Sequence, residues 1–178
     1  MKFTETPLQG AYLITPELLE DERGFFARSF CRHEFADHGL NADFVQGNLS
    51  FNKLKGTLRG MHYQAHPHAE VKLVRCTAGA IYDVIIDLRA ESPTFMNWFA
   101  AELTAENYQQ LYVPKGFSHG YQTMEDHTEV SYQVSSFYSP ASERGVRWND
   151  PAFGIAWPLA VSFISCKDAA HPDWEALL

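Results

Sequence analysis

The pattern of apolar and polar residues predicts a chain built mainly from short β-strands. VKLVRC (71–76) and AIYDVIIDL (80–88) are rich in β-branched and apolar residues, a composition typical of strands. Only residues 77–79, which end in glycine, separate these two segments, so we predict that they form a hairpin. QQLYVP (109–114) predicts another short strand that ends at proline, and EVSYQVSSFY (129–138) alternates between apolar and polar positions.

Turn residues divide these segments at short intervals. SPT (92–94), PKG (114–116) and NDP (149–151) are such turns, and many short strands between turns are typical of a jelly roll or barrel. Helical patterns are few, and the best are CRHEFADHGL (31–40) and PDWEALL (172–178). No repeat or linker divides the chain. We therefore predict an all-β fold with a few short peripheral helices, formed by residues 1–178 as one domain.

The period of two along a strand predicts which side chains share a face. Tyr132 and Tyr138 fall on one face of segment 129–138, roughly 20 Å apart along an ideal strand. If that face lines a cavity, one tyrosine could contact a sugar and the other a nucleotide joined to it. Lys72 shares a face with the apolar Val74 and Cys76, which predicts that Lys72 points inward.

LRGMHYQ (58–64) predicts an irregular strand. Strict alternation places His62 and Arg59 on opposite faces, although both residue types suit a polar cavity. A β-bulge between them would bring both side chains to one side. Gly60 is the natural position for such a bulge, because glycine inside a strand often marks one.

The composition narrows the function classes. The 178 residues are 46% hydrophobic and 20% charged, with a formal net charge of −8 at pH 7. This charge argues against nucleic acid or an anionic membrane as the main partner, while leaving room for a basic pocket that holds a phosphorylated small molecule. Three cysteines without a C-x-x-C motif, and no signal-like or membrane-spanning apolar run, favour a reduced, cytoplasmic protein.

Two motifs resemble the signatures of the cupin superfamily. The first signature, H-x-H-x3-E-x6-G, is matched in spacing by His66, His68, Lys72 and Gly79. PKGFSH (114–119) matches the second signature, P-x-G-x2-H. Metal-binding cupins use two histidines and the glutamate of the first motif with the histidine of the second, here His119. Lys72 stands at the glutamate position, and a protonated lysine cannot bind a metal. The alternative is a metal site made from the three histidines, with Lys72 beside the ion and repelling it.

A different chemistry fits the same segments. A histidine, a lysine and a tyrosine on strands of one barrel supply a base, a charge stabiliser and an acid, here His62, Lys72 and Tyr132. Such a base needs a carboxylate on its other ring nitrogen. Asp168 is our candidate, although spacing alone does not separate it from Asp83, Asp87 and Asp150.

Further residues are candidates for binding a phosphorylated ligand. The guanidinium groups of Arg23 and Arg59 match phosphate oxygens in geometry. Phe25 or Phe26 could stack on a base. In VQGNLSFN (45–52), alternation places three polar side chains on one face of a strand: Gln46, Asn48 and Ser50.

Taken together, the motifs resemble the dTDP-4-dehydrorhamnose 3,5-epimerase family of nucleotide-sugar epimerases from about residue 10 to 172. The matching segments are D-x-RGFF (21–26), QGNLS (46–50), KGTLRGMHYQ (55–64), KLVRC (72–76), DLRAESPTF (87–95), VPKGFSHG (113–120), YSPASERGVRWNDP (138–151) and SCKD (165–168). The resemblance implies a cupin-type jelly-roll homodimer that needs no metal or organic cofactor. It also implies a nucleoside-diphosphate 4-keto-6-deoxy sugar as substrate, in deoxysugar or surface-polysaccharide synthesis.

The resemblance further implies residue roles. His62 is the base that removes the proton next to the C4 ketone, and Asp168 is its partner. Lys72 stabilises the enolate with help from His119, and Tyr132 returns a proton to the opposite face.

The remaining implied roles concern the nucleotide. Arg59 and Arg23 bind the diphosphate, Tyr138 and Phe26 flank the base, and Gln46 and Asn48 contact the nucleotide. Residues 1–50 act as an arm involved in dimerisation, so Arg23 comes from the partner chain. Arg28 and Leu49 stand where the family often has glutamate and histidine, which leaves the identity of the base open.

Three alternatives remain at this point. The first is an epimerase that inverts only one carbon, or a keto-sugar isomerase on the same fold. The second is a metal-dependent cupin oxygenase that uses His66, His68 and His119. The third is a sugar-binding cupin without activity, against which the presence of His62, Lys72 and Tyr132 together argues.

Overall fold

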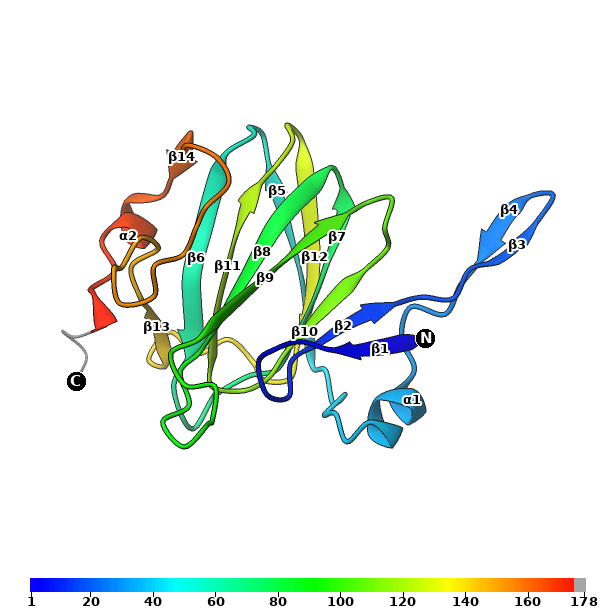
Figure 1. Cartoon of the computed structure of the whole chain (residues 1–178), viewed down its shortest axis with the longest axis horizontal. Coiled ribbons are helices and arrows are strands. Elements are labelled where there is room, and N and C mark those ends of the chain that lie inside the picture. The colour runs from blue at the N-terminus through cyan, green and yellow to red at the C-terminus, as the bar shows by residue number, and fades with distance from the viewer. Residues whose placement is uncertain (175–178) are drawn as a thin grey trace.

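The structure is a computed structural model that describes residues 1–174. Two antiparallel sheets face one another to form a jelly roll, as predicted (Figure 1). The first sheet contains, in spatial order, β1 (Lys2–Glu5), β2 (Tyr12–Thr15), β10 (Gln110–Val113), β7 (Lys72–Ala78), β12 (Thr128–Val134) and β5 (Gln46–Asn52). The second contains β13 (Glu143–Gly145), β6 (Thr57–Gln64), β11 (Phe117–Thr123), β8 (Ala80–Asp87) and β9 (Trp98–Thr104).

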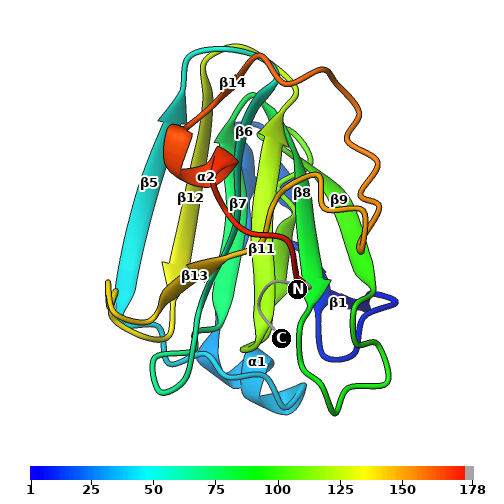
Figure 2. The same cartoon turned by 90° about the vertical axis from the view of Figure 1, so that its left-hand side faces the viewer.

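Smaller elements surround the two sheets. A short strand, β14 (Phe163–Ile164), pairs in parallel with β6 at the edge of the second sheet. The helix α1 (Arg32–Asp37) confirms the helix predicted in 31–40, whereas α2 (Cys166–Ala169) was not predicted. The predicted helix 172–178 lies mostly outside the described residues. Seen from the side, α2 lies beside β6, and β13 pairs with β6 at the edge of the second sheet (Figure 2).

Apolar layers explain why the central strands are almost continuously hydrophobic. Between the sheets, side chains from both contribute to one core, among them Val74, Ile81, Ile85, Leu111 and Val130. On the outer side of the first sheet, Phe35 of α1 packs against Leu73 and Tyr112. On the outer side of the second, Val84 and Ile86 are covered by Val146 and Phe153. Strands buried on both faces need apolar side chains at odd and even positions alike.

The predicted hairpin between segments 71–76 and 80–88 is wrong. Both segments are strands, but β7 belongs to the first sheet and β8 to the second, so the chain crosses between sheets at Gly79. Gly79 has a φ of 72°, and a Cβ there would lie 2.5 Å from Oγ1 of Thr128. The glycine is needed for this close approach, and a crossover and a hairpin turn use the same residue type.

The strand predicted over 129–138 ends earlier than expected. β12 stops at Val134, because the next residue exchanges hydrogen bonds with Val71: Ser135 N–H donates to its carbonyl, and Ser135 Oγ accepts from its N–H. Tyr138 therefore lies in a loop, and the predicted common strand face of Tyr132 and Tyr138 is not formed.

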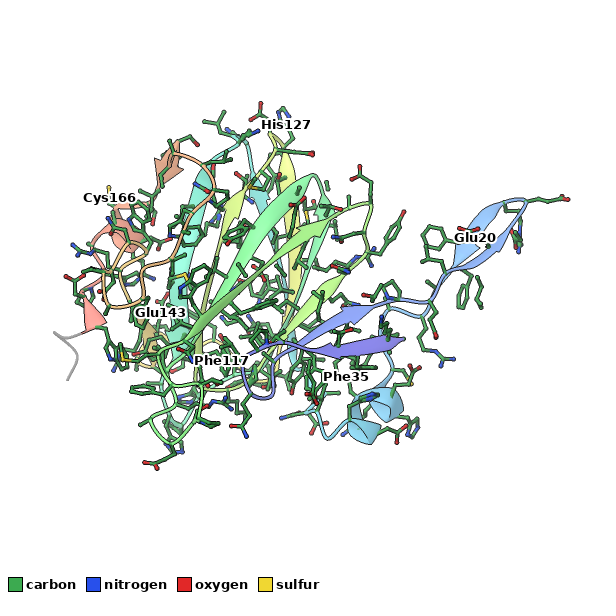
Figure 3. All side chains as sticks on the ribbon, viewed as in Figure 1. Glu20, Phe35, Phe117, His127, Glu143 and Cys166 are labelled. Atoms are coloured by element: carbon green, nitrogen blue, oxygen red, sulfur yellow. The ribbon has the colours of Figure 1, made fainter. Side chains whose placement is uncertain are left out.

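A two-stranded hairpin forms an arm that extends away from the sheets. It consists of β3 (Leu19–Asp21) and β4 (Gly24–Phe26), and it projects from the β1–β2 end of the molecule (Figure 1). Glu20 on this arm lies at the far side of the molecule from Glu143 and Cys166 (Figure 3). Among the described residues, no helix is long and apolar enough to cross a membrane.

The predicted irregularity at Gly60 is confirmed. Between the pairs His62–His119 and Arg59–Tyr121, β6 has two residues and β11 has only one. Gly60 has a φ of 128°, and a Cβ on it would lie 2.6 Å from the Cα of Gly120. This bulge turns both Arg59 and His62 toward the space between the sheets.

We predict that Gly60→Ala destabilises the protein by about 1–3 kcal/mol, because the positive φ and the contact with β11 both exclude a side chain. Gly47→Ala is the matched control, since a Cβ at Gly47 meets nothing within 4 Å. The free energies of unfolding of the two variants, measured with denaturant, should differ by at least about 1 kcal/mol. Equal values would show that the bulge does not depend on glycine.

Candidate active site

A polar cavity lies between the two sheets, at the end where β6 and β12 face each other. It consists of two adjoining hollows of about 300 and 240 Å³. Three residues line both hollows: His62, Lys72 and Tyr132. They come from β6, β7 and β12, so the cavity brings together side chains from both sheets.

His62 is held by a buried carboxylate. Its Nε2 lies 2.8 Å from Oδ1 of Asp168, and Oδ2 of Asp168 accepts a hydrogen bond of 3.1 Å from the backbone N–H of Gly60. Ser165 caps α2 by accepting from the Asp168 N–H, which fixes the helix that carries the carboxylate. With Nε2 bound to Asp168, Nδ1 is the nitrogen of His62 left to act on a ligand.

The electrostatics of Asp168 fit a charged partner for an imidazole. Burial favours its neutral form, but the hydrogen bond and charge of His62 and the Gly60 N–H outweigh this and hold the pKa of Asp168 below its usual value. Of the carboxylates that spacing left open, Asp83 instead bonds His119, and Asp87 bonds Arg89. Asp150 accepts from backbone N–H groups of Ala152 and Trp174.

Lys72 points inward, as its strand position predicts. It is only 8% exposed, and its Nζ lies 2.8 Å from Oε1 of Glu70. The other oxygen of Glu70 accepts 2.9 Å from Nε2 of Gln64. An ammonium group in a largely buried cavity needs such a partner, because a lone buried charge is strongly disfavoured.

Tyr132 faces the same junction from β12, next to the strand of Lys72 and in the sheet opposite His62. Burial raises the pKa of its phenol, and the charges of Tyr121 and Glu70 act in the same direction. The phenol is therefore protonated near neutral pH and available to donate a proton.

A second imidazole lines the smaller hollow. Nε2 of His119 lies 2.7 Å from Oδ1 of Asp83, a carboxylate with no exposed surface. Arg59 lines this hollow too, with its Nε donating 2.7 Å to Oδ1 of Asn52. Each of the two imidazoles thus has its own carboxylate.

The larger hollow contains three of the residues predicted to contact a nucleotide: Gln46, Asn48 and Tyr138. Gln46 donates from Nε2 to Oδ1 of Asn48 at 2.8 Å. The hydroxyl of Tyr138 donates 2.8 Å to Glu143, which also binds Lys167. The alternation in β5 turns its polar residues toward the cavity, while its apolar residues Leu49 and Phe51 are exposed, although Leu49 also lines the smaller hollow.

Arg23 and Phe26 do not reach the cavity of their own chain. Both lie on the arm, where the Arg23 side chain is 89% exposed and pairs with Asp21, and Phe26 is 70% exposed. These two predicted binding residues are thus exposed to solvent, away from the cavity of their own chain.

The alternative metal site does not form. His66 lies in an exposed loop, His68 is bonded to Ser142 at 2.9 Å, and His119 is bonded to Asp83. Among residues 1–174, the one group with three ligand atoms within 4.8 Å of one another is a different set, and His62 belongs to it.

Sequence reasoning missed the roles of three acidic residues: Glu70 and Glu143 line the larger hollow, and Asp83 is buried behind His119. Glu70 and Glu143 were not among the predicted site residues, and Asp83 was considered only as a partner for His62. A charged residue inside the apolar strand 80–88 is a signal that could have pointed to Asp83, because an acid buried in a strand needs a partner. Glu70 and Glu143 carry no comparable signal in the sequence.

The chain is similar in sequence and in structure to known proteins. A sequence model of the family described as dTDP-4-dehydrorhamnose 3,5-epimerase matches residues 5–176. The chain belongs to this family. The resemblance seen in the motifs is thereby confirmed, together with the prediction of an isomerase.

Individual relatives agree with this family assignment. The dTDP-4-dehydrorhamnose 3,5-epimerase of Salmonella typhimurium is 43% identical over 170 residues, covering 94% of this chain and 92% of that protein. The crystal structure of the enzyme from Elizabethkingia anophelis matches with a TM-score of 0.96 at 40% identity, covering 99% and 97% of the two chains. That of a Legionella pneumophila dTDP-6-deoxy-D-glucose-3,5-epimerase in complex with dTDP-4-keto-L-rhamnose matches with a TM-score of 0.92 at 36% identity, covering 99% and 94%.

We predict that Asp168→Asn lowers stability at pH 7 and that this difference shrinks in acid. The pKa of Asp168 is lower in the folded chain than in the unfolded chain, so its contribution is present above about pH 4 and is lost as the pH falls through the lowered pKa. Denaturant unfolding of both proteins at pH 7, 5 and 3 measures this. A difference that is constant with pH would contradict it.

Proposed function

We propose that the chain inverts C3 and C5 of a dTDP-linked 4-keto-6-deoxy sugar through an enolate. The observation that carries this proposal is the meeting of His62, Lys72 and Tyr132 at the junction of the two hollows. Family membership supports it, as does the keto sugar bound by the Legionella pneumophila relative.

In the first step, His62 acts as the base. The C4 ketone acidifies the neighbouring C–H bonds, because the electron pair left behind delocalises onto the ketone oxygen. Nδ1 of His62 takes the proton, and Asp168 stabilises the imidazolium that forms. The Lys72 ammonium stabilises the negative oxygen of the enolate, and His119 contributes a hydrogen bond from the smaller hollow.

In the second step, Tyr132 acts as the acid. Inversion requires that the new proton arrive on the face opposite to the one from which the first was taken. β6 and β12 lie in opposite sheets, so His62 and Tyr132 approach the sugar from opposite sides. The phenol gives its proton to carbon and regains one from water, while His62 releases its proton. The second carbon then follows the same cycle.

The nucleotide is bound by residues from two chains. Arg59 binds the diphosphate, Tyr138 stacks on the base, and Gln46 and Asn48 contact the nucleotide portion. The arm of a partner chain supplies Arg23 and Phe26, so the protein acts as a homodimer built around residues 1–50. The exposure of both side chains on a projecting hairpin supports this arrangement.

This chemistry needs only a base, an acid and a positive charge, so we infer an enzyme without metal or organic cofactor. We also place it in the cytoplasm, where its three unpaired cysteines would stay reduced, in a pathway of deoxysugar or surface-polysaccharide synthesis.

Exchange with heavy water separates the two proton transfers. We expect His62→Asn to lower deuterium incorporation at C3 and C5 by about 10²–10⁴-fold, because no base is left. Tyr132→Phe should still exchange protons but form no inverted product. Tyr12→Phe, a tyrosine outside the cavity, is the control. NMR of the sugar reads both effects.

Wild-type exchange in His62→Asn would overturn the assigned base. Label at C3 alone in the wild-type enzyme would assign the chain to the epimerases that invert one carbon.

We expect Arg23→Ala to raise KM by roughly 10–100-fold, because a charge-assisted hydrogen bond to phosphate is lost. Arg32→Ala removes another exposed arginine, which pairs with Asp43 on the surface, and should leave KM unchanged. Steady-state kinetics with the dTDP-linked substrate measure this, and light scattering at the same concentration reports the dimer. An unchanged KM in Arg23→Ala would show that the arm does not bind the diphosphate.

A further inference from the structure

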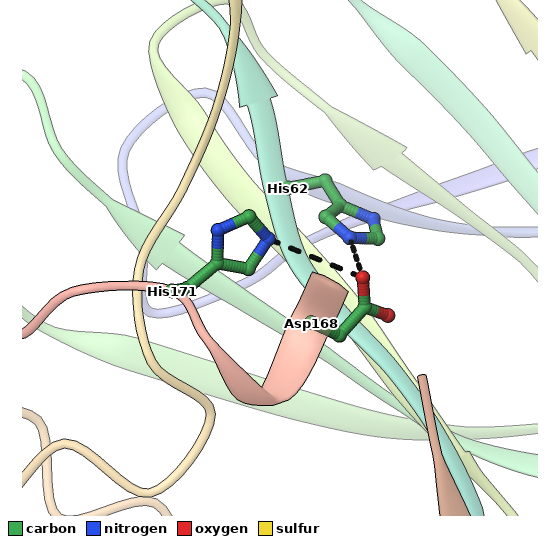
Figure 4. A group of neighbouring side chains, drawn as sticks. All are labelled: His62, Asp168 and His171. Atoms are coloured by element: carbon green, nitrogen blue, oxygen red, sulfur yellow. Dashed lines mark hydrogen bonds and ion pairs between the residues drawn. The ribbon is translucent and has the colours of Figure 1, made fainter. Parts of the chain in front are cut away.

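A third side chain approaches the carboxylate that holds His62. His171 follows α2, and its Nε2 lies 4.0 Å from Oδ1 of Asp168, the same oxygen that His62 contacts (Figure 4). The two imidazole rings have centroids 5.5 Å apart and planes at 75°. The proposed reaction does not use His171.

The environment of His171 gives it no other partner among residues 1–174. Its side chain is 12% exposed, and its Nε2 is buried without a hydrogen bond. A buried imidazole nitrogen without a partner is costly, and it calls for an explanation. The ring is held in place tightly, since a Cβ on Gly145 would overlap it.

We propose that His62, Asp168 and His171 form a binding site for a divalent transition-metal ion, with Zn²⁺ as the best fit. Two imidazoles and one carboxylate are a donor set that zinc accepts, with a fourth position left for water. His62 lines both hollows, whereas Asp168 and His171 line neither, so the ion would lie behind the His62 ring, on the side away from the cavity.

The distances between the three ligand atoms are compatible with a bound ion once the side chains move slightly. All three ligand atoms lie within 4.8 Å of one another, so a central ion lies no more than about 2.8 Å from each. Zinc bonds to histidine and carboxylate are about 2.0–2.2 Å long, so shifts below about 1 Å complete the site. The neighbouring cation Lys167 is paired with Glu143 at 2.6 Å, which reduces its repulsion of an ion.

Metal binding would inhibit the enzyme through the tautomer of His62, a consequence that rests on the proposed function. The ion replaces the proton on Nε2, so the remaining proton of the neutral ring lies on Nδ1. Nδ1 is the atom that must accept a proton from the sugar, and it then has no free electron pair. The ion therefore blocks the base without covering the rest of the cavity, and a chelator restores activity.

Metal binding is tested first, with a measurement that does not depend on enzyme activity. The protein is treated beforehand with a chelator to remove bound metal. Cys166→Ser serves as the background, because this exposed thiol lies two residues from Asp168 and could capture zinc itself. Calorimetric titration with Zn²⁺ should show one site per chain. His171→Asn should weaken it by at least about tenfold, the loss that even an outer partner of a metal ligand can cause.

Two further variants serve as controls. His33→Asn removes an exposed imidazole on α1 and should leave binding unchanged. His171→Cys keeps a zinc ligand and should retain the site, which separates a lost ligand from lost packing. Circular dichroism checks that each variant is folded. Equal Zn²⁺ affinity in the background protein and in His171→Asn would overturn the proposal.

Inhibition is tested on the same proteins with deuterium incorporation as the readout. Zn²⁺ should inhibit the background enzyme, EDTA should reverse the inhibition, and His171→Asn should need at least about tenfold more Zn²⁺ while keeping its basal rate. Equal inhibition of both proteins would overturn the link between this site and the base. Chelator-treated background enzyme without exchange would instead count against the proposed function, and the calorimetric result would still decide the metal site.

Discussion

The site depends on one carboxylate that is bound at both of its oxygens by the same irregular strand. Asp168 accepts from the backbone N–H of Gly60 and from the ring of His62, two residues further along β6. The bulge that frees this N–H also turns Arg59 and His62 to the same side of the strand. The bulge at Gly60 thus orients the imidazole of His62, holds α2 against the sheet through Asp168, and directs Arg59 into the cavity.

The proposed inversion needs catalytic groups on both faces of the sugar ring, and two facing sheets can supply them. A single sheet face would present all of its groups to one side of a sugar ring. In this jelly roll the imidazole of His62 and the phenol of Tyr132 come from different sheets, and the Lys72 ammonium joins them from the neighbour of β12. The lysine position that departs from the metal-binding cupin signature supplies the positive charge at that point, balanced by Glu70.

The sequence predicted those features that follow from local periodicity. Inward Lys72, the bulge at Gly60 and the polar face of β5 all follow from the period of two and from glycine geometry. The β7–β8 crossover was mistaken for a hairpin, because Gly79 has the same local chemistry in both. The selection of Asp168 among four aspartates, and the roles of Glu70 and Glu143, depend on contacts between distant segments, which one sequence does not encode in any local pattern.

The projecting arm has a consequence for mixtures of chains. If each cavity receives Arg23 from the partner chain, a substitution in the arm of one chain impairs the cavity of its partner. A substitution in the barrel instead impairs the cavity of the same chain. A mixed pair that carries an altered Arg23 on one chain and an altered His62 on the other holds one cavity with both defects and one with neither. Two impaired proteins would then form one fully equipped cavity in each mixed pair when their subunits exchange.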